Sequence, residues 1–425
     1  MDQGEISFGS KDEVLAQARE FWNPGKTDFW TDAGVPLVID RREEYFIYDM
    51  TGTRLLDVHL NGGTYNLGHR NPEVVAAVTA AMSRFDIGNH HFPSLARSAL
   101  AEALVSSAPP GLTKVVYGSG GGEAVDIAIK TARHATQRRK VVSIEKAYHG
   151  HTGLAVGTGD DRFSTLFLSD RPEEFPHVPF NDLTAMEAAL RDRDVAAVIM
   201  ETIPATYGFP LPEAGYLESV KALCERYGSL YIADEVQTGL MRTGELWGIS
   251  KHGIAPDILV TGKGISGGMY PISAVLVSEA AAGWLTEDGF GHISTFGGAE
   301  LGCIAAMKAL EICSRPETRS MVHYISDLVE RGLRDIAASM PDWFVGIRAN
   351  GVVMGLEFAR PEGAKTVMRE LYANGVWAIF STLDPRVLQF KPGILMSPEL
   401  CEDLLDRVDV AIRRAGAETR RERAA

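Results

Sequence analysis

Short runs of β-branched and apolar residues recur through the middle of the chain, and helical patterns separate several of them. The runs occupy residues 115–117, 141–144, 195–200, 230–233, 257–260 and 272–277, with helical periodicity at 123–135 and 217–227. Strands that are apolar on both faces belong to a sheet that is covered on both sides, and helical crossovers make such strands parallel. The pattern therefore predicts an α/β protein built on a mostly parallel sheet.

The two ends of the chain follow different patterns. The first 70 residues look irregular apart from strand-like runs at 45–48 and 54–57, and Asn71-Pro72-Glu73 then begins a helix. After a helical stretch at 299–313, strand-like runs at 352–358 and 387–390 indicate a smaller α+β domain. We therefore expect an N-terminal segment at 1–70 that packs with the small domain, a large domain at 71–318 and the small domain at 319–425.

Composition narrows the class of protein. A net charge of −14, from 42 basic and 56 acidic residues, argues against a general nucleic-acid binder. No apolar run has membrane-spanning length, and residues 1–5 lack the basic and apolar regions of a signal peptide. The four cysteines have no metal-ligand spacing. We therefore expect a cytoplasmic protein with reduced cysteines, without a metal and without a membrane or nucleic-acid partner.

A glycine-rich segment, Ser119-Gly120-Gly121-Gly122-Glu123-Ala124, follows one strand-like run and opens a helix. Glycines let the backbone approach a ligand closely, and a helix N-terminus offers free N–H groups to an anion. The segment therefore fits a phosphate site. A tight turn without any ligand explains the same residues equally well.

Two further polar residues fall at strand ends. Asp234 closes the run at 230–233, and Lys263 follows the run at 257–260 between two glycines. The carboxyl edge of an open α/β sheet is where ligands bind, and a confined lysine loses its proton easily enough to attack an aldehyde. Taken singly, Asp234 also fits a helix N-cap and Lys263 a solvated turn.

The three segments together favour one chemistry. A phosphate anchor, a carboxylate and an amine at strand ends of one sheet are the groups that a pyridoxal phosphate (PLP) site requires. The carboxylate would keep the cofactor's ring nitrogen protonated, and the amine would form an imine with its aldehyde. The joint pattern therefore predicts a PLP enzyme with Lys263 as the imine-forming residue.

Several motifs make the chain resemble the class III (ornithine/4-aminobutyrate-type) aminotransferases over nearly its whole length. They are Asn66-Leu67-Gly68-His69, the run Ile232 to Gly244, Pro256 to Gly264, and Ser294-Thr295-Phe296-Gly297-Gly298. The resemblance implies the fold type I architecture of PLP-dependent transferases, with a mostly parallel seven-stranded sheet in the large domain. It also implies an aminotransferase that moves an amino group by a ping-pong mechanism.

The resemblance assigns roles around the cofactor ring. Lys263 would hold PLP as a Schiff base and move the proton between the substrate carbon and the cofactor carbon. Asp234 would pair with the ring nitrogen. Val236 would pack on one ring face, and Tyr148, in Ala147-Tyr148-His149-Gly150, would stack on the other. Gln237 would lie near the ring hydroxyl.

Further roles concern the phosphate and a second subunit. Gly121 and Gly122 would bind the phosphate through backbone N–H groups. Thr295 would reach the phosphate of the neighbouring subunit, and the segment 90–92 would approach the neighbour's site or simply pack there. Glu201 matches a family glutamate near the site. The resemblance thus implies a homodimer with shared active sites.

Three positions depart from relatives that use glutamate as amino donor. His151 and Gln389 stand where those relatives carry carboxylate-binding arginines, and Thr206 stands where ornithine-type members carry a pairing glutamate. A carboxylate in a closed site needs a charge-assisted partner, best supplied by a bidentate arginine. We therefore expect a donor other than the standard glutamate or ornithine, unless Arg162, Arg386 or Lys391 substitutes from another direction.

The expected substrates are an amine or amino acid and an oxo acceptor, and Trp22 and Tyr65 are further candidates for the substrate pocket. The same cofactor also serves aminomutases and racemases, which remain an alternative. A non-catalytic binding protein would have lost Lys263 or Asp234, and both are present.

Overall fold

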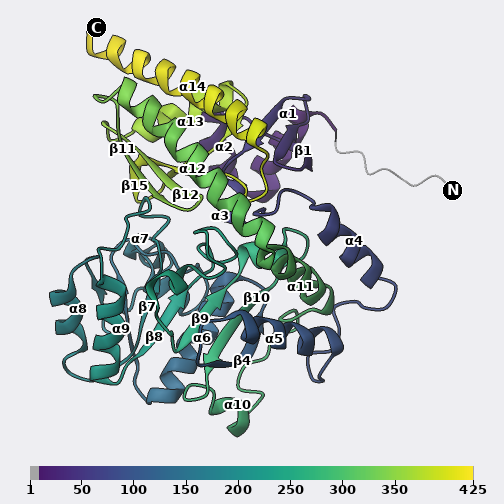
Figure 1. The fold of residues 1–425 in the computed structure, drawn as a ribbon, viewed down its shortest axis with the longest axis vertical. Helices are drawn as coiled ribbons and strands as arrows, with labels where there is room; N and C mark the ends of the chain where they lie inside the picture. Colours follow the sequence, from purple (N-terminus) through teal and green to yellow (C-terminus); the bar gives the residue numbers. More distant parts are fainter. Residues whose placement is uncertain (1–8, 425) are drawn as a thin grey trace.

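A seven-stranded sheet forms the centre of the larger half of the molecule in a computed structural model, which describes residues 9–424 (Figure 1). Its order is β4-β10-β9-β8-β7-β5-β6. Only β10 runs antiparallel to its neighbours within this sheet. The strands are β4 (Leu112–Gly118), β5 (Lys140–Ile144), β6 (His177–Val178), β7 (Val195–Glu201), β8 (Leu230–Asp234), β9 (Ile258–Thr261) and β10 (Ser273–Ser278).

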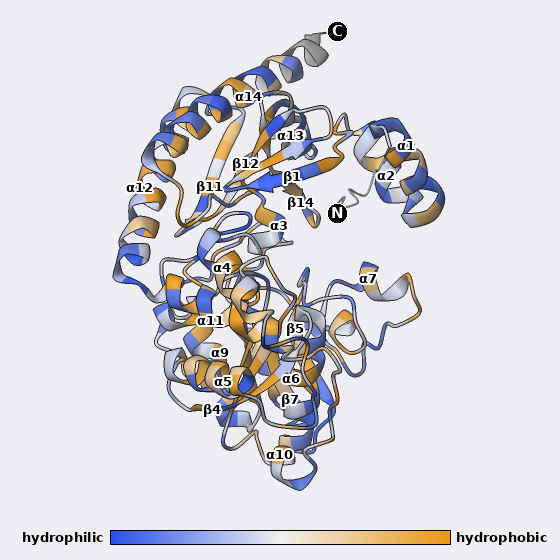
Figure 2. Cartoon of the chain, turned by 90° about the vertical axis from the view of Figure 1, so that its right-hand side faces the viewer, coloured by the Kyte–Doolittle hydropathy of each residue, from blue (hydrophilic) through white to orange (hydrophobic). Residues whose placement is uncertain are grey.

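Helices cover both faces of this sheet. Along β9, Ile258 and Val260 pack in one apolar cluster with α6, while Leu259 packs in a second cluster with α5, α9 and α11. Successive side chains of a strand point to opposite faces, so an apolar run is buried on both sides. Figure 2 shows these strands as a hydrophobic interior. The helices of this part are α5 (Leu95–Ser107), α6 (Gly121–Thr136), α7 (Asp161–Thr165), α8 (Leu183–Leu190), α9 (Tyr216–Tyr227), α10 (Trp284–Glu287) and α11 (Glu300–Ser314).

Two smaller four-stranded sheets form the other half. One is antiparallel, in the order β11-β12-β15-β14, and the other joins the N-terminal strands β1, β2 and β3 to β13 from the C-terminal part. The long helix α12 (Pro316–Ser339) runs from the large half to the small half (Figure 1). The remaining bounds are β1 (Ile39–Glu43), β2 (Phe46–Asp49), β3 (Arg54–Asp57), β11 (Phe344–Asn350), β12 (Val353–Phe358), β13 (Val376–Trp377), β14 (Ile379–Ser381), β15 (Asp384–Phe390), α13 (Gly363–Ala373) and α14 (Pro398–Ala424).

Helices precede and follow the N-terminal strands. Before β1 lie α1 (Lys11–Gln17), a π-helical turn η1 (Ala18–Trp22) and α2 (Pro24–Asp32), and between β3 and α5 lie α3 (Leu60–Gly63) and α4 (Pro72–Ala81). The short 3-10 helices are η2 (Ala155–Thr158), η3 (Gly248–His252) and η4 (Lys263–Ser266).

The expected strands and helices of the centre appear within a few residues of their predicted positions, so the α/β prediction with a mostly parallel sheet is confirmed. The expectation that the first 70 residues are irregular is wrong between Lys11 and Asp32, where Ser10 and Asn23 cap short helices. These helices bury little, so they leave no clear apolar period in the sequence. The expected boundary at 318/319 falls inside α12, and the three-part division stays a prediction.

Candidate active site

The carboxyl edge of the large sheet gathers the residues that sequence analysis singled out. Asp234 ends β8 and pairs in register with Glu201, the last residue of β7. Lys263 begins η4 directly after β9, and the glycine loop connects β4 to α6. Because these strands are parallel, their carboxyl ends lie at one edge and bring segments far apart in sequence together.

Lys263 has a constrained backbone and a confined side chain. Its φ of 44° lies in the left-handed region, which non-glycine residues adopt at a cost of about 1–2 kcal/mol. A Cβ added at Gly62 would lie 3.0 Å from Lys263 Cε, so the side chain needs a glycine beside it. Burial lowers the pKa of Lys263, and the carboxylates of Asp234 and Glu201 partly oppose that shift. A lowered pKa increases the fraction of Lys263 that is present as the neutral, nucleophilic amine.

Asp234 is held by two donors. Its Oδ1 accepts from Val236 N–H at 3.0 Å, and its Oδ2 lies 2.7 Å from His149 Nδ1. The other ring nitrogen of His149 lies 3.3 Å from Ser143 Oγ. Both Asp234 and His149 are buried, so water cannot replace these bonds. The sequence pattern does not single out His149, although it directly follows Tyr148 in the chain.

Glu201 is a second buried carboxyl group beside Asp234. Its oxygens accept from the backbone N–H groups of Tyr148 and Ala205, each at 3.2 Å. Burial raises the pKa of Glu201 to about 7, and Asp234 adds to the rise, while His149 and the Ala205 N–H oppose it. A carboxyl group with that pKa exchanges its proton near neutral pH.

The glycine loop leaves room and donors for an anion. Gly120 caps α6 without any side-chain bond to the first turn, and a Cβ added there would meet no atom within 4 Å. A Cβ on Gly121 would lie 3.2 Å from Val236 Cγ1, and one on Gly150 would lie 2.7 Å from Gly122 Cα. Close approach of three segments therefore requires glycine, and the N–H groups of the first turn remain available.

A cavity of about 330 Å³ opens beside Lys263. Of the predicted residues it brings together Tyr148, His151, Glu201, Gln237, Gln389 and Thr206. The other lining residues, which sequence analysis did not identify, come from loops and short strands without a recognisable motif. They are His59, Phe163, Ala205, Ile379, Phe380 and Thr382.

Other predicted residues lie elsewhere within this chain. Trp22 is 71% exposed on η1, and Tyr65 packs with its ring 4.1 Å from that of His69; neither lines the cavity. Thr295 and the segment 90–92 are exposed on the surface. The tertiary structure therefore does not place Trp22 or Tyr65 in the substrate cavity of their own chain.

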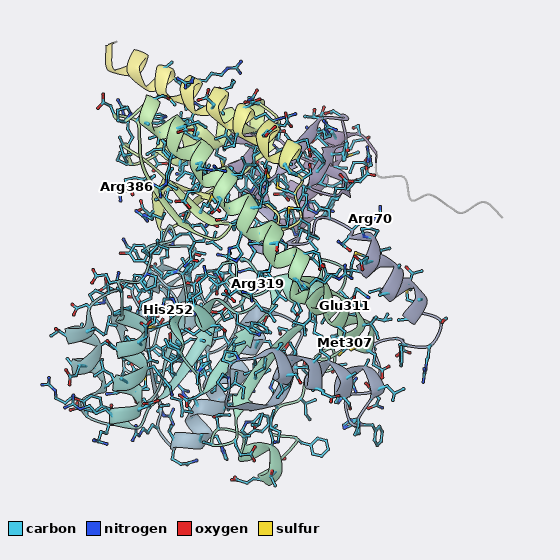
Figure 3. The ribbon with its side chains drawn as sticks, viewed as in Figure 1. Arg70, His252, Met307, Glu311, Arg319 and Arg386 are labelled. Atoms are coloured by element: carbon cyan, nitrogen blue, oxygen red, sulfur yellow. The ribbon has the colours of Figure 1, made fainter. Side chains whose placement is uncertain are left out.

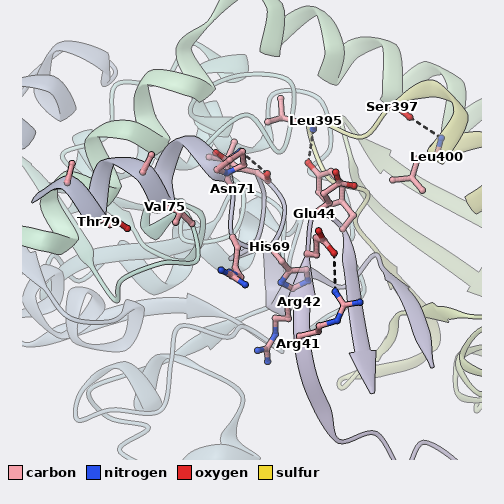
Figure 4. Close-up of a pocket in the computed structure, with 17 residues that line it drawn as sticks. Arg41, Arg42, Glu44, His69, Asn71, Val75, Thr79, Leu395, Ser397 and Leu400 are labelled. Carbon is pink, nitrogen blue, oxygen red and sulfur yellow. Dashed lines mark hydrogen bonds and ion pairs between the residues drawn. The ribbon is translucent and has the colours of Figure 1, made fainter. Parts of the chain in front are cut away.

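A larger cavity, of about 1060 Å³, lies between β1, α4 and the start of α14 (Figure 4). Arg41, Arg42 and Glu44 line one side, and Val75 and Thr79 of α4 line another. Lys263 and Asp234 are absent from its lining. The larger of these two cavities is therefore not the one that contains the residues predicted to carry the chemistry.

The residues around Lys263 fit PLP. The amide nitrogen of Gln237 is buried and has no hydrogen-bond partner among the described residues, so it is a donor that awaits an acceptor such as the ring hydroxyl. Tyr148 lines the cavity, and Val236 lies against the glycine loop at Gly121. Asp234 could receive the ring nitrogen, and the α6 N-terminus could receive the phosphate. The roles of these residues toward PLP stay predictions.

The described residues offer neither a metal-ligand cluster nor a membrane-spanning helix. No group of three or more His, Cys, Asp and Glu residues within residues 9–424 could hold a metal ion. Among the helices of the described part, none combines the length and apolarity needed to cross a membrane. The cytoplasmic location stays a prediction.

Comparisons with known proteins identify the family of the chain. A family model described as aminotransferase class-III matches residues 30–412. An uncharacterized aminotransferase of Archaeoglobus fulgidus is 40% identical over 408 residues, which cover 95% of this chain and 96% of the relative. A putrescine aminotransferase of Pectobacterium atrosepticum is 31% identical over 92% of this chain and 87% of its own length.

A solved structure extends the agreement to the fold. The ornithine aminotransferase of Toxoplasma gondii, whose active site shows partial PLP occupancy, superposes with a TM-score of 0.88 at 25% identity over 97% of each chain. The matches span the sheet, both smaller sheets and the strand ends around Lys263. The chain therefore belongs to the class III aminotransferases, a PLP-dependent enzyme family.

Proposed function

We propose that this aminotransferase takes its amino group from a primary amine that carries no carboxylate, and passes it to an oxo acceptor in a ping-pong cycle through Lys263. The observation that carries the proposal is the lining of the cavity. Among the described residues that line it, Lys263 is the only lysine or arginine. His151, Gln389 and Thr206, which replace the expected charged groups, all lie there with it.

The two arginines named as substitutes do not change this view. Arg386 lies at the outer edge of the small domain (Figure 3) and is paired with Asp384 and Glu357. Arg162 lies at the rim, where it donates to the backbone oxygen of Thr382 at 3.2 Å. A donor carboxylate would therefore meet no preorganised guanidinium inside the cavity, which disfavours an α-amino acid donor.

Each residue has a defined task in the proposed reaction. When bound, PLP would supply an electron-withdrawing ring that can accept the electron pair of a substrate C–H bond. Lys263 Nζ would take the proton from the substrate carbon and give it back on the cofactor side. Asp234, oriented by His149, would hold the ring nitrogen protonated. Tyr148 and Val236 would hold the ring between them, and Gln237 would donate to the ring hydroxyl.

The test is a screen of amino donors with the PLP-loaded enzyme. Putrescine, on which a relative acts by name, and simple monoamines are compared with glutamate and ornithine. Conversion of bound PLP to its amino form is followed by absorbance. The proposal requires amines to be the better donors, and a preference for glutamate or ornithine by orders of magnitude would refute it. Turnover of a single substrate without an oxo acceptor would instead indicate an aminomutase or racemase.

We also propose that the active unit is a homodimer in which Thr295 reaches the partner's phosphate. Exposed aromatic residues support this, since Phe92, Phe290 and Phe296 are 67%, 63% and 57% exposed near Thr295. An apolar patch of this kind marks an interaction surface. Sedimentation of Phe290→Glu should show monomers with reduced activity, whereas Val345→Glu, at an exposed position on β11, should stay dimeric. A wild-type enzyme that is monomeric and fully active would contradict the proposal.

A further inference from the structure

The segment that leads from α10 into α11 is bonded to the glycine loop of its own chain through Glu123. We call residues 292–298 the strap, since they carry Thr295, the residue proposed to reach the partner's phosphate. Glu123 lies in the first turn of α6, directly after the glycine loop that is expected to receive the phosphate of its own subunit. The bonds of one carboxylate therefore connect two places that serve different cofactors.

One oxygen of Glu123 holds the glycine loop. Its Oε2 accepts from both the backbone N–H and the hydroxyl group of Ser119, each at 2.7 Å. Ser119 directly precedes Gly120, the residue that caps α6, so these bonds fix the entry to the loop. A shift of the loop therefore either moves Glu123 or breaks two hydrogen bonds to a charged group.

The Glu123 carboxylate also holds the strap. The hydroxyl group of Ser294 donates to it, and His292 Nε2 lies 3.4 Å from Oε1. Lys130 of α6 lies 2.7 Å from His292 Nδ1, and because an ammonium only donates, the proton of a neutral ring is on Nε2, the atom near Glu123. Burial raises the pKa of Glu123, but the bonds from Ser119 and Ser294 outweigh burial and lower it, so the group is ionised at neutral pH.

The strap is packed closely against the end of β4 as well. A Cβ added at Gly298 would lie 2.8 Å from Tyr117 Cδ2, and the Gly298 carbonyl oxygen accepts from Arg97 Nε at 2.8 Å. Arg97 also donates to the backbone oxygens of Asn89 and Phe92. Both segments that are expected to approach the partner are therefore bonded to each other and to the strand that leads into the glycine loop.

We propose that Glu123 is a positioning residue that couples the two active sites of the dimer, because it holds Thr295 ready for the partner's phosphate when its own loop is occupied. Phosphate in the loop would fix Ser119, and Ser119 would fix Glu123 and with it the strap. The second cofactor would then meet an ordered strap and lose less conformational entropy on binding. Coupling between sites is reciprocal, so each site should favour the other. This inference rests on the homodimer and the Thr295 contact proposed above.

The first measurement is a titration of PLP into the apoenzyme, followed by absorbance of the covalently bound cofactor. A coupling of about fivefold between two sites gives a Hill coefficient of about 1.4. Glu123→Gln, which replaces an accepting oxygen with a donor, should lower the coefficient to about 1. Glu279→Gln is the matched control, because Glu279 also accepts from a hydroxyl group of β4, that of Thr113 at 2.9 Å, but at the opposite end of the strand.

A mixed dimer separates an effect on the partner from an effect on the residue's own loop. The reporter subunit is wild type, and the silent subunit carries Lys263→Ala, so the absorbance band reports the reporter alone. The silent subunit further carries one of four changes, namely Glu123→Gln, Ser294→Ala, Thr295→Ala or the control Glu279→Gln. Each of the first three should weaken PLP binding to the reporter about fivefold or more, and the control should not. Ser294→Ala removes only the strap side of the contact, so it serves if Glu123→Gln fails to fold.

Glu123 acts through Thr295, so the two losses should not add. In a silent subunit with Thr295→Ala, the further change Glu123→Gln should alter the reporter's affinity by less than about twofold. Unchanged reporter affinity with Glu123→Gln and Ser294→Ala, while Thr295→Ala weakens it, would confine Glu123 to its own loop and overturn the inference. A wild-type Hill coefficient of 1 would overturn it too.

Failure of the proposed function gives different results. Unaltered reporter affinity in all variants, Thr295→Ala included, would remove the Thr295 contact from the proposed homodimer together with the coupling. The donor screen is independent of PLP titration, so a preference for glutamate would refute the proposed donor and leave the coupling standing.

Discussion

Replacing His149 with phenylalanine removes the imidazole that orients Asp234. The bond between His149 Nδ1 and Asp234 Oδ2 is 2.7 Å long, and the two residues are only 3% and 4% exposed. A hydrogen bond to a charged group contributes about 1.5–3 kcal/mol, and about 1.4 kcal/mol corresponds to a factor of ten. Because water cannot replace the lost donor, and Asp234 is proposed to hold the ring nitrogen, PLP should bind about 10- to 100-fold more weakly.

The assay is titration of PLP into the apoenzyme, followed by absorbance of the bound cofactor. His149→Asn keeps an N–H donor and should recover part of the affinity. His252→Phe is the matched control, because His252 also lies near a carboxylate, Glu218 at 3.3 Å, but on the outer surface of the large domain (Figure 3). If His149→Phe bound PLP as tightly as His252→Phe, the role given to His149 would be wrong.

Three further outcomes are expected. Lys263→Ala should lose the absorbance band of the covalently bound cofactor, and an unaltered band would refute the central assignment. Glu201, with a pKa raised to about 7, holds its proton more tightly in the folded protein, so its contribution to stability is present at acidic pH and is lost as pH rises through 7. The free energy of unfolding of apo Glu201→Gln, obtained from melting curves, should therefore rise relative to that of the wild type between pH 5 and 8, by at most about 3 kcal/mol. The same pH dependence in both proteins would contradict the raised pKa. Gly150→Ala places a methyl group 2.7 Å from Gly122 Cα at a φ of 111°, so it should weaken PLP binding in a titration. Gly52→Ala is the control for left-handed backbone strain, because a Cβ at Gly52 meets no atom within 4 Å.

Prediction from sequence worked best where local chemistry dictates structure. Continuous apolar runs at β7, β8 and β9 required a sheet covered on both faces, since such strands cannot face water. Glycine next to Lys263 and in the loop at 120–122 marked places where the backbone must approach something closely. Because parallel strands end at one edge, Asp234 and Lys263 could be expected together before any coordinate was known.

Prediction failed where the signal was weak or not local. The helices α1 and α2 bury little and show no strong period, so they were missed. Trp22 and Tyr65 were plausible pocket residues by type, but aromatic residues serve many packing roles, and nothing in the sequence fixes which surface they meet. The cavity is also lined by His59 from the N-terminal part of the chain and by Phe380 and Thr382 from the C-terminal part. No motif around these three residues indicates that they lie near Lys263.

The amino-acid sequence by itself determined the α/β sheet, the order of the segments at its carboxyl edge and the lysine proposed to hold the cofactor, because apolar periodicity, glycine and strand-end position are local properties of the chain. Only the tertiary structure decided that His149 holds Asp234, that Glu201 is buried beside it and that the buried Lys391 donates to Gln389. Those relations depend on burial and on contacts between distant segments. Burial determines how strongly a charged side chain interacts with its neighbours. The position of a residue in the sequence does not reveal how deeply the fold will bury that side chain.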